Sequence, residues 1–407
     1  MSLNIENWFN TAEVKRFYFP GKIFSGVGTF AMAIDLCMQD KGKILVVVDR
    51  NLYQLAFVKE QVKRLDKYLT NIVLVNGTPY TQDVYESFQS QSVKPSHILA
   101  IGGGSTIDFA KAMLAMFHFG KIEDLGLYGK EASPTIETKP LLVAVPTTAG
   151  SGAEASRYFV TYDKNDKHKV FGKNWGLIAD WIMLDPLFMQ SMPLEGIVAC
   201  GFDAFVHLFE SLICRYEKST TGEMFSLYGI TNLLLSLQSI MDSNQRDSKN
   251  YTKLMEISTL GGIALSNVRT GNIHEAAGAL LELTNLSHAE TLFVFFRTAI
   301  EQYQGEILDL ERLLIAHLKI YPQFNNINNL NDLIMWWEGA FKKVGLDQKI
   351  NSAIPELKPT LGVVRDHIFQ RIYADKVWIS KESPINLNEK DIWELIDISF
   401  NRFSINR

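Results

Sequence analysis

The chain has 407 residues, of which 47% are hydrophobic and 21% are charged, and its formal net charge is -5. This length exceeds the usual size of one hydrophobic core, so about two domains are expected. The acidic balance without Lys or Arg clusters gives no footprint for a nucleic acid or an anionic membrane surface, which leaves small-molecule chemistry as the expectation.

The first half of the chain alternates short β-branched runs with helical stretches. Each run is apolar on both faces and is bounded by Gly, Asp, Asn or Pro, which is typical of strands covered by helices on both sides. The candidate strands are Ile44–Val48, Ile72–Val75, Ile98–Ile101 and Leu141–Val145. The pattern predicts a doubly wound, Rossmann-like α/β domain with a parallel sheet.

Asp49 ends the first of these strands. A carboxylate at that position accepts hydrogen bonds from an adenosine ribose diol and repels a 2′-phosphate, which favours NAD(H) over NADP(H). The neighbouring Arg50 argues the other way. The alternative role of Asp49 is to cap the following helix.

A glycine-rich turn follows the third strand. Gly102, Gly103, Gly104 and Ser105 lead into a helix that carries Asp108. Glycines at such a turn let backbone N–H groups approach a pyrophosphate, which then lies at the positive end of the helix dipole. The spacing is not GxGxxG, and a turn that needs glycines for packing alone is the alternative.

A second loop, Pro146–Glu154, follows the fourth strand. It contains Thr147, Thr148, Gly150 and Ser151. Hydroxyl groups and small residues at the carboxyl end of a strand suit ligand contacts at an open α/β sheet. A polar turn that caps the next helix is the alternative.

Beyond Asp185 and Pro186 the pattern becomes helical, with long amphipathic segments and almost no alternation of period two. The expected helices are Leu194–Tyr216, Ser226–Met241, Tyr251–Ser266, His288–Tyr303, Leu308–Ile320, Leu330–Val344 and Asp391–Phe403. We therefore expect an α/β nucleotide-binding domain over residues 1–186 and an all-helical domain over residues 187–407.

Asp203 and His207 form the most informative pair in the chain. Their i, i+4 spacing places a carboxylate and an imidazole on one helix face, among apolar residues where charged groups need a partner or a metal. His274 and His288, on a later helical stretch, would complete a set of one oxygen and three nitrogens that suits Fe2+ or Zn2+. An ordinary pair of neighbours on a partly wet helix is the alternative.

Together these features resemble the iron-containing (group III) alcohol dehydrogenase family over nearly the whole chain. The run GGGSTIDFAK matches that family's GGGSxxDxAK, and PTTAGSGAE is similar to its PTTAGTGSE loop. Asp203 and His207 stand where the family has its first two metal ligands, and His274 and His288 have the separation of the other two.

The resemblance implies the architecture of this family, shared with dehydroquinate synthase, with a catalytic metal in the cleft between the two domains. It implies that the triglycine turn binds pyrophosphate, that Thr147 and Thr148 line the cofactor, that Asp49 meets the adenosine ribose and that Lys169 lies near the nicotinamide ribose. It also implies a homodimer or a higher homo-oligomer.

The chain departs from the family at the third ligand, where the usual HxxxH has Gly278 as its last residue. The family's second histidine serves in proton transfer, so this relay is missing or rerouted. A small residue there favours a substrate larger than ethanol, and similar losses occur in family branches that act on sugar acids or phosphonate-bearing aldehydes. Arg157, Lys173 or Arg269 would then pair with an acidic group, although surface salt bridging is the more ordinary role for each.

The expected activity is a metal-dependent, NAD(P)-linked oxidation of alcohols and reduction of aldehydes or ketones. The alternatives are a dehydroquinate synthase-like cyclase and a catalytically silent NAD-binding homologue. No apolar run approaches the roughly 18 residues that span a bilayer, and the start MSLNIENWFN lacks the order of a signal peptide, so we expect a soluble, cytoplasmic protein.

Overall fold

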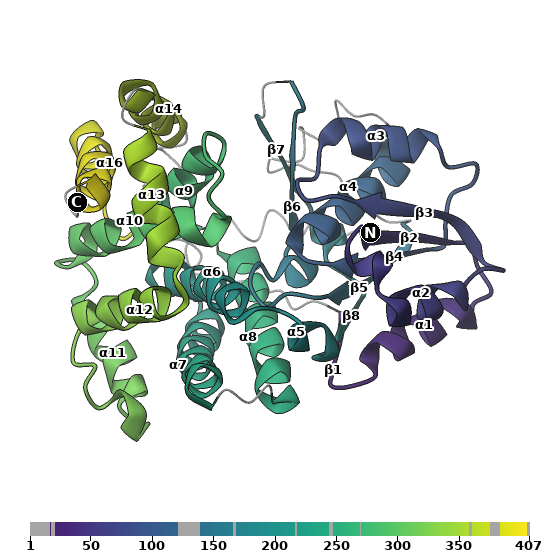
Figure 1. Cartoon of the computed structure of the whole chain (residues 1–407), viewed down its shortest axis with the longest axis horizontal. Coiled ribbons are helices and arrows are strands. Elements are labelled where there is room, and N and C mark those ends of the chain that lie inside the picture. Colours follow the sequence, from purple (N-terminus) through teal and green to yellow (C-terminus); the bar gives the residue numbers. More distant parts are fainter. Residues whose placement is uncertain are drawn as a thin grey trace, which may run out of the picture. The chain divides into compact units, whose positions relative to one another are not determined.

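A computed structural model of the chain describes residues 17, 21–120, 139–165, 168–215, 218–243, 247–268, 270–357, 360–374 and 383–404. Packing divides it into two compact units (Figure 1). The N-terminal unit contains Phe19–Met192 and Gln238–Ser266, and the C-terminal unit contains Pro193–Leu237 and Asn267–Arg407. A domain boundary between residues 186 and 187 stays a prediction, but nearly all of helix α8 (Ser248–Asn267) and the end of the preceding helix from Gln238 onward belong to the N-terminal unit and not to the unit of the other predicted helices.

The N-terminal unit is built on a six-stranded sheet with the strand order β1-β8-β5-β4-β2-β3, in which every pair is parallel. The four expected strands are confirmed, and two short edge-side strands were not expected. The strands are β1 (Lys22–Ser25), β2 (Ile44–Asp49), β3 (Leu69–Val75), β4 (His97–Gly102), β5 (Leu141–Pro146) and β8 (Trp181–Leu184).

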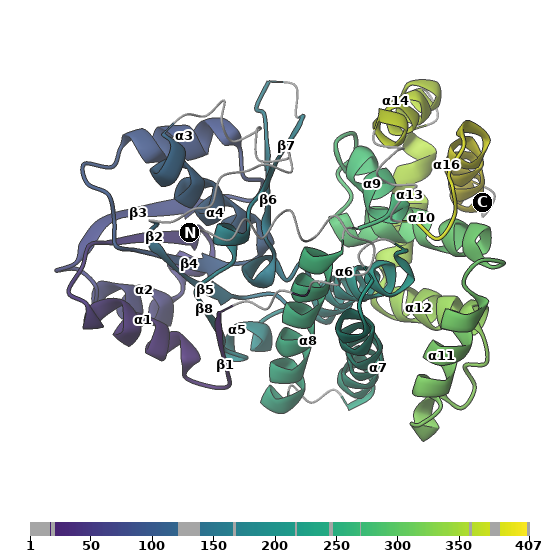
Figure 2. The same cartoon turned by 180° about the vertical axis from the view of Figure 1, so that it is seen from behind.

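Helices cover both faces of this sheet, as the apolar character of the strands predicts. Helices α1 (Thr29–Gln39) and α2 (Ala56–Lys63) lie on one face, and α3 (Thr81–Gln89) and α4 (Gly104–Phe119) lie on the other (Figures 1 and 2). All six residues of β4 are buried. The sandwiched parallel sheet confirms the expected α/β fold class.

The register of the sheet brings the two loops of interest together. Gly102 at the end of β4 is paired with Pro146 at the end of β5, and Val48 of β2 is paired with Ile101 of β4. The carboxyl ends of these strands therefore meet at one edge, which in open α/β sheets is where ligands bind.

A two-stranded antiparallel hairpin, β6 (Tyr158–Tyr162) and β7 (Lys169–Lys173), also belongs to this unit and was not expected. Helix α8 supports the loop that precedes the hairpin. Gly152, with a φ of 58°, lies so close to Gly262 of α8 that a Cβ on Gly262 would stand 2.0 Å from the Gly152 carbonyl oxygen.

The described part of the C-terminal unit is helical and contains no strand, as expected. Two helices begin and end at the predicted residues, α10 and α12, while α9, α13 and α14 were not expected. The helices are α6 (Leu194–Ile213), α7 (Thr220–Ser243), α9 (Asn272–Leu281), α10 (His288–Tyr303), α11 (Leu308–Leu318), α12 (Leu330–Val344), α13 (Leu346–Glu356), α14 (Leu361–Ala374) and α16 (Glu389–Ser404). The end of the first predicted helix, at Tyr216, lies outside the described residues.

The expectation that no apolar run approaches the length of a membrane span was wrong. Among the described residues, Leu194–Ile213 and Thr220–Asp242 are long and apolar enough by length and composition. In the apolar window of each helix, 78% and 67% of the residues are buried within the protein, as in a core helix. Length and composition alone therefore do not distinguish a core helix from a membrane-spanning helix.

Candidate metal centre and nucleotide-binding loops

Helix α6 has two buried faces of different chemistry. Phe202 and Phe205 pack against Phe296 of α10 and Trp337 of α12, with ring centroids 4.9–5.5 Å apart. This aromatic contact fixes the rotation of α6 about its axis. Asp203, His207 and Glu210 follow at i, i+4 and i+7 and share another face.

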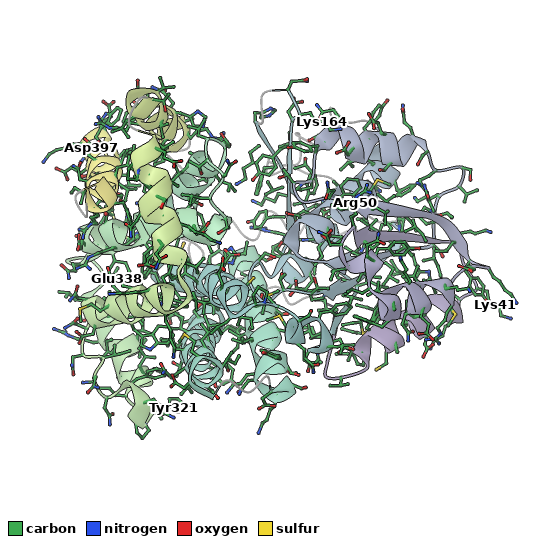
Figure 3. All side chains as sticks on the ribbon, in the orientation of Figure 1. Lys41, Arg50, Lys164, Tyr321, Glu338 and Asp397 are labelled. Carbon is green, nitrogen blue, oxygen red and sulfur yellow. The ribbon has the colours of Figure 1, made fainter. Side chains whose placement is uncertain are left out.

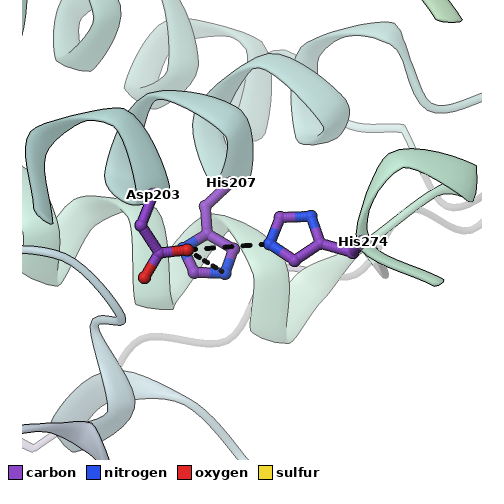
Figure 4. A group of neighbouring side chains, drawn as sticks. All are labelled: Asp203, His207 and His274. Carbon is purple, nitrogen blue, oxygen red and sulfur yellow. Dashed lines mark ion pairs between the residues drawn. The ribbon is translucent and has the colours of Figure 1, made fainter. Parts of the chain in front are cut away.

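The four predicted ligands lie together in the C-terminal unit. From Oδ1 of Asp203, Nε2 of His207 is 3.8 Å away, Nε2 of His274 is 3.8 Å away and Nε2 of His288 is 3.6 Å away. Figure 4 shows Asp203, His207 and His274 pointing toward one another. Ligand atoms bound to one tetrahedral ion at about 2.1 Å lie about 3.4 Å apart, so these separations suit a single cation.

Local sequence explains how the two later histidines reach this place. His288 is the first residue of α10, and a capping box fixes that start, because Ser287 and Glu290 exchange side chain to backbone hydrogen bonds. His274 lies in the first turn of α9, which begins after Gly271.

The facing ligand atoms do not satisfy one another by hydrogen bonds, which suits a metal site. Asp203 is 9% exposed and His274 is 9% exposed, yet Oδ1 of Asp203 and Nε2 of His274 make no hydrogen bond with any described residue. A buried carboxylate oxygen and imidazole nitrogen in that state are costly, which favours a bound cation.

The charges within the cluster attract strongly. Burial by itself raises the pKa of Asp203, but the facing imidazoles of His207, His274 and His288 bring that pKa well below its usual range. Burial lowers the pKa of His274, but the carboxylates of Glu210 and Asp203 outweigh it and raise that pKa to about 9. The site therefore concentrates negative charge that a proton or a metal ion can neutralise.

Glu210 was missed in the sequence although it shares the Asp203 face. Its Oε2 lies 2.6 Å from Nδ1 of His274, and its Oε1 accepts the N–H of Ile273 at 3.0 Å. A carboxylate on Nδ1 leaves Nε2 of the same ring as the ligand atom, which is the usual support of a metal-binding histidine. The i+7 spacing from Asp203 was the signal available in the sequence.

In the N-terminal unit the two glycine-containing loops are packed against each other. A Cβ on Gly103 would stand 3.3 Å from Cγ2 of Thr148, and a Cβ on Gly104 would stand 2.6 Å from Oγ of Ser151. The N–H of Thr147 donates to the carbonyl of Gly102 at 3.1 Å. Part of the need for glycine is therefore packing, which was the alternative interpretation of this turn.

The start of α4 remains suited to a phosphate. Gly103 is its N-cap and supplies no side-chain cap, and Ser105 in the first turn is exposed. Because this sixteen-residue helix has no side-chain cap from its N-cap residue within the described part of the chain, its first turn presents both N–H donors and the positive end of the helix dipole.

The remaining predicted cofactor residues have structural contacts of their own. Oδ1 of Asp49 accepts the N–H groups of Asn51 and Leu52, at 2.8 and 3.0 Å, so Asp49 does cap the next turn, and Arg50 beside it is exposed (Figure 3). Asp108 accepts the N–H of Val160 at 3.1 Å. Gly150 is buried in the second loop, and Lys169 lies on β7, with Nζ 5.9 Å from the centroid of the Phe171 ring.

Two buried charged residues, Lys111 and Glu154, and the half-buried Asp108 join these elements. Nζ of Lys111 donates to the carbonyls of Ser156 and Tyr158, at 2.6 and 2.7 Å. Glu154 accepts the hydroxyl of Thr259 of α8 at 2.8 Å. We refer to Asp108, Lys111 and Glu154 as the lysine cluster.

A family model described as iron-containing alcohol dehydrogenase matches residues 20–186, and the C-terminal model of the same family matches residues 197–325. The chain belongs to the iron-containing alcohol dehydrogenase family. The family predicted from the sequence is thereby confirmed.

Curated relatives within this family are distant. Aldehyde-alcohol dehydrogenase 2 of Entamoeba histolytica is 25% identical over 304 residues, which are 71% of this chain and 34% of that protein. A 4-hydroxybutyrate dehydrogenase of Clostridium kluyveri is 26% identical over 233 residues, which are 55% of this chain and 60% of that protein. The chain thus spans about a third of the first relative's length.

The fold of the iron-containing alcohol dehydrogenases is confirmed by solved structures. The sulfoacetaldehyde reductase from Bifidobacterium kashiwanohense, solved in complex with NAD+, superposes with a TM-score of 0.78 at 14% identity, covering 97% of this chain and 100% of that chain. The iron-containing alcohol dehydrogenase from Thermococcus thioreducens superposes with a TM-score of 0.77 at 18% identity, covering 95% of this chain and 100% of that chain, so both units share the fold of these structures.

One prediction about charged residues was wrong. Arg157, for which a surface salt bridge was the ordinary role, is 3% exposed and forms no ion pair with a described residue. Lys173 lies on β7, and Arg269 lies outside the described residues.

Proposed function

We propose that this protein is a metal-dependent, NAD(H)-linked oxidoreductase that interconverts an alcohol and an aldehyde or ketone. The observation that carries the proposal is the convergence of three imidazole nitrogens on one buried carboxylate oxygen, at 3.6–3.8 Å. Membership of the iron-containing alcohol dehydrogenase family supports the reaction class.

Asp203, His207, His274 and His288 would hold Fe2+ or Zn2+. When bound, the ion supplies Lewis acidity at the substrate oxygen, and the dinucleotide supplies the hydride acceptor or donor. Asp203 contributes the negative charge of the site, and Glu210 fixes the ring of His274 so that Nε2 faces Asp203.

In the N-terminal unit the first turn of α4 would bind the pyrophosphate of NAD(H), and Thr147, Thr148, Gly150 and Ser151 would line the same ligand. Oδ1 of Asp49 already accepts two backbone N–H groups of the next turn. The other carboxylate oxygen, Oδ2, is therefore the one proposed to bind the adenosine ribose. A carboxylate at this position repels a 2′-phosphate, which favours NAD(H) over NADP(H). Lys169 is proposed to lie near the nicotinamide ribose.

The substrate is proposed to be larger than ethanol and to carry an acidic group. A Cβ on Gly278, one turn after His274 on α9, would meet no described atom within 4 Å. This open space replaces the second imidazole of HxxxH. The names of two similar proteins, 4-hydroxybutyrate dehydrogenase and sulfoacetaldehyde reductase, support substrates with a carboxylate or a sulfonate.

The test is a carbonyl panel on protein reconstituted with Fe2+ or with Zn2+. We expect metal-dependent oxidation of NADH, slower oxidation of NADPH, and a larger kcat/KM for succinic semialdehyde than for acetaldehyde. Metal-loaded protein that turns over no carbonyl compound would contradict the proposal. Release of inorganic phosphate from a sugar phosphate would point instead to a cyclase, and absence of stoichiometric metal would point to a silent homologue.

A homodimer or larger homo-oligomer is part of the proposal. Light scattering coupled to size-exclusion chromatography measures the mass of the assembly against the 46.1 kDa of one chain.

A further inference from the structure

Arg157 occupies a rigidly held position in the N-terminal unit. It follows the short turn η4 (Ala153–Ala155) and precedes β6. Its N–H donates to Oγ of Ser266 at 3.0 Å, and its carbonyl accepts the N–H of Asn174 at 2.9 Å. Both backbone groups are therefore fixed by neighbouring elements of the same unit.

The guanidinium group is buried between aromatic rings. Its Cζ lies 4.3 Å from the centroid of the Trp175 ring and 5.2 Å from that of the Tyr158 ring. Nε donates to the hydroxyl of Tyr158 at 3.2 Å. Among the described residues, the two terminal nitrogens, Nη1 and Nη2, form neither a hydrogen bond nor a salt bridge, and Arg157 is 3% exposed.

This arrangement leaves a buried positive charge without a negative partner. An arginine stays protonated at every pH that a protein tolerates, so the charge is not removed by loss of a proton. Aromatic faces offset part of the cost of burying it, but a buried cation generally has a carboxylate beside it. Nη1 and Nη2 form the planar fork that binds a carboxylate, sulfonate or phosphate through two oxygens.

The acidic side chains of the adjoining elements are engaged elsewhere. Asp108 accepts the N–H of Val160, and Glu154 accepts the hydroxyl of Thr259. The missing anion is therefore expected from a ligand.

We propose that Arg157 is a binding site for the oxyanion of a small molecule, a carboxylate, a sulfonate or a phosphate. The oxyanion belongs to an acidic substrate or to a phosphate of the dinucleotide. The assignment of the source rests on the proposed function, but the binding of an anion does not.

The first experiment needs no catalysis. Thermal melting of the full chain is recorded in sodium phosphate and in sodium acetate, with sodium chloride at equal ionic strength as reference. We expect the anions to raise the melting temperature of the wild type, and to raise that of Arg157→Met by less than half as much. Arg64→Met is the control, because Arg64 lies in the same unit, is exposed and already pairs with Asp35.

The second experiment separates the two sources of the oxyanion. If the substrate supplies it, Arg157→Met lowers kcat/KM for succinic semialdehyde relative to butanal by at least about tenfold, and the Kd for NADH stays within twofold. If the dinucleotide supplies it, the Kd for NADH, measured by calorimetry, rises at least about tenfold and the substrate ratio is unchanged.

Arg157→Lys tests the fork itself, since it keeps the charge and the fold but offers a single ammonium. We expect it to lose affinity for the same ligand as Arg157→Met. The proposal is overturned if the variants respond to phosphate and acetate as the wild type does, with the substrate ratio and the Kd for NADH unchanged. Protein that binds anions through Arg157 but reduces no aldehyde would contradict the proposed function alone.

Discussion

The protein has two largely buried clusters of charged residues, one in each unit. They differ in how far their polar groups find hydrogen-bond partners within the chain. In the lysine cluster every charged group has partners within the chain, because Lys111 donates to two carbonyls, Asp108 accepts from Val160 and Glu154 accepts from Thr259. In the Asp203 cluster, Oδ1 of Asp203 and Nε2 of His274 have no hydrogen bond among the described residues. A cluster that satisfies itself stabilises a fold, whereas one that leaves facing ligand atoms unsatisfied is suited to a ligand.

The sharpest test of this contrast is Asp203→Asn. We expect loss of bound metal and a fall in kcat/KM of at least about 10³-fold, since the amide removes the one negative ligand. Metal content by elemental analysis and turnover of NADH measure the two effects. Asp309→Asn, on a 97% exposed side chain, is the control, and metal retention in Asp203→Asn would remove the contrast.

Lys111→Met should act on stability and leave the metal in place. It strands the carbonyls of Ser156 and Tyr158 and leaves Asp108 and Glu154 without their nearby cation, so the free energy of unfolding should fall by about 3 kcal/mol. Urea denaturation measures this. The exposed Lys63→Met is the control, expected within about 0.5 kcal/mol of the wild type. An equal loss in both variants would show that the lysine cluster is not structural.

We expect Glu210→Gln to weaken metal binding less than Asp203→Asn and more than Lys111→Met. The amide keeps the size of the side chain but weakens its hold on Nδ1 of His274, so the Kd for the metal should rise about 10- to 100-fold. Competition with a chelator measures that constant. Glu306→Gln changes an exposed glutamate and should leave it unaltered.

Gly278→His returns an imidazole to the open space on α9. We expect kcat/KM for succinic semialdehyde to fall about tenfold relative to acetaldehyde, because the side chain fills room that a longer substrate uses. Gly278→Ala serves as the matched control, with a smaller change in the same ratio. A ratio that does not move in either variant would disprove a role for position 278 in substrate size.

The smallest expected effect is a pH dependence that the lysine cluster imposes. Burial lowers the pKa of Lys111 to about 8 from its ordinary value of 10.5, and the charges of Asp108 and Glu154 oppose this. Between these two pH values the unfolded chain binds more protons at this position than the folded protein, so the free energy of unfolding should rise with pH. Urea titrations from pH 7 to 10 should show a shallower rise in Lys111→Met than in the wild type.

Elements with a strong local pattern could be predicted from the sequence, and those fixed by distant contacts could not. The buried strands β2, β4 and β5 were found because both of their faces are apolar, whereas β1 and β8 have four residues each and too little pattern to stand out. The assignment of α8 to the N-terminal unit depends on the close approach of Gly152 and Gly262, which are far apart in the chain.

The candidate metal site could be predicted because Asp203 and His207 share a helix face, and because His274 and His288 on a later helical stretch complete the ligand set; the family resemblance then supported the same four residues. Glu210 could also have been predicted, because its i+7 spacing places it on the helix face of Asp203. The burial of Arg157 could not have been predicted from local sequence, because it depends on contacts with Trp175, which follows the hairpin, and with Ser266 of α8.

Glu210 performs two tasks with one carboxylate, since it holds the ring of His274 and accepts the N–H of Ile273 at the start of α9. Order in the first turn of that helix and retention of the cation are thus thermodynamically linked. Any change that frays this turn weakens the grip on the ion by the same free energy, and an ion in place protects the turn from opening.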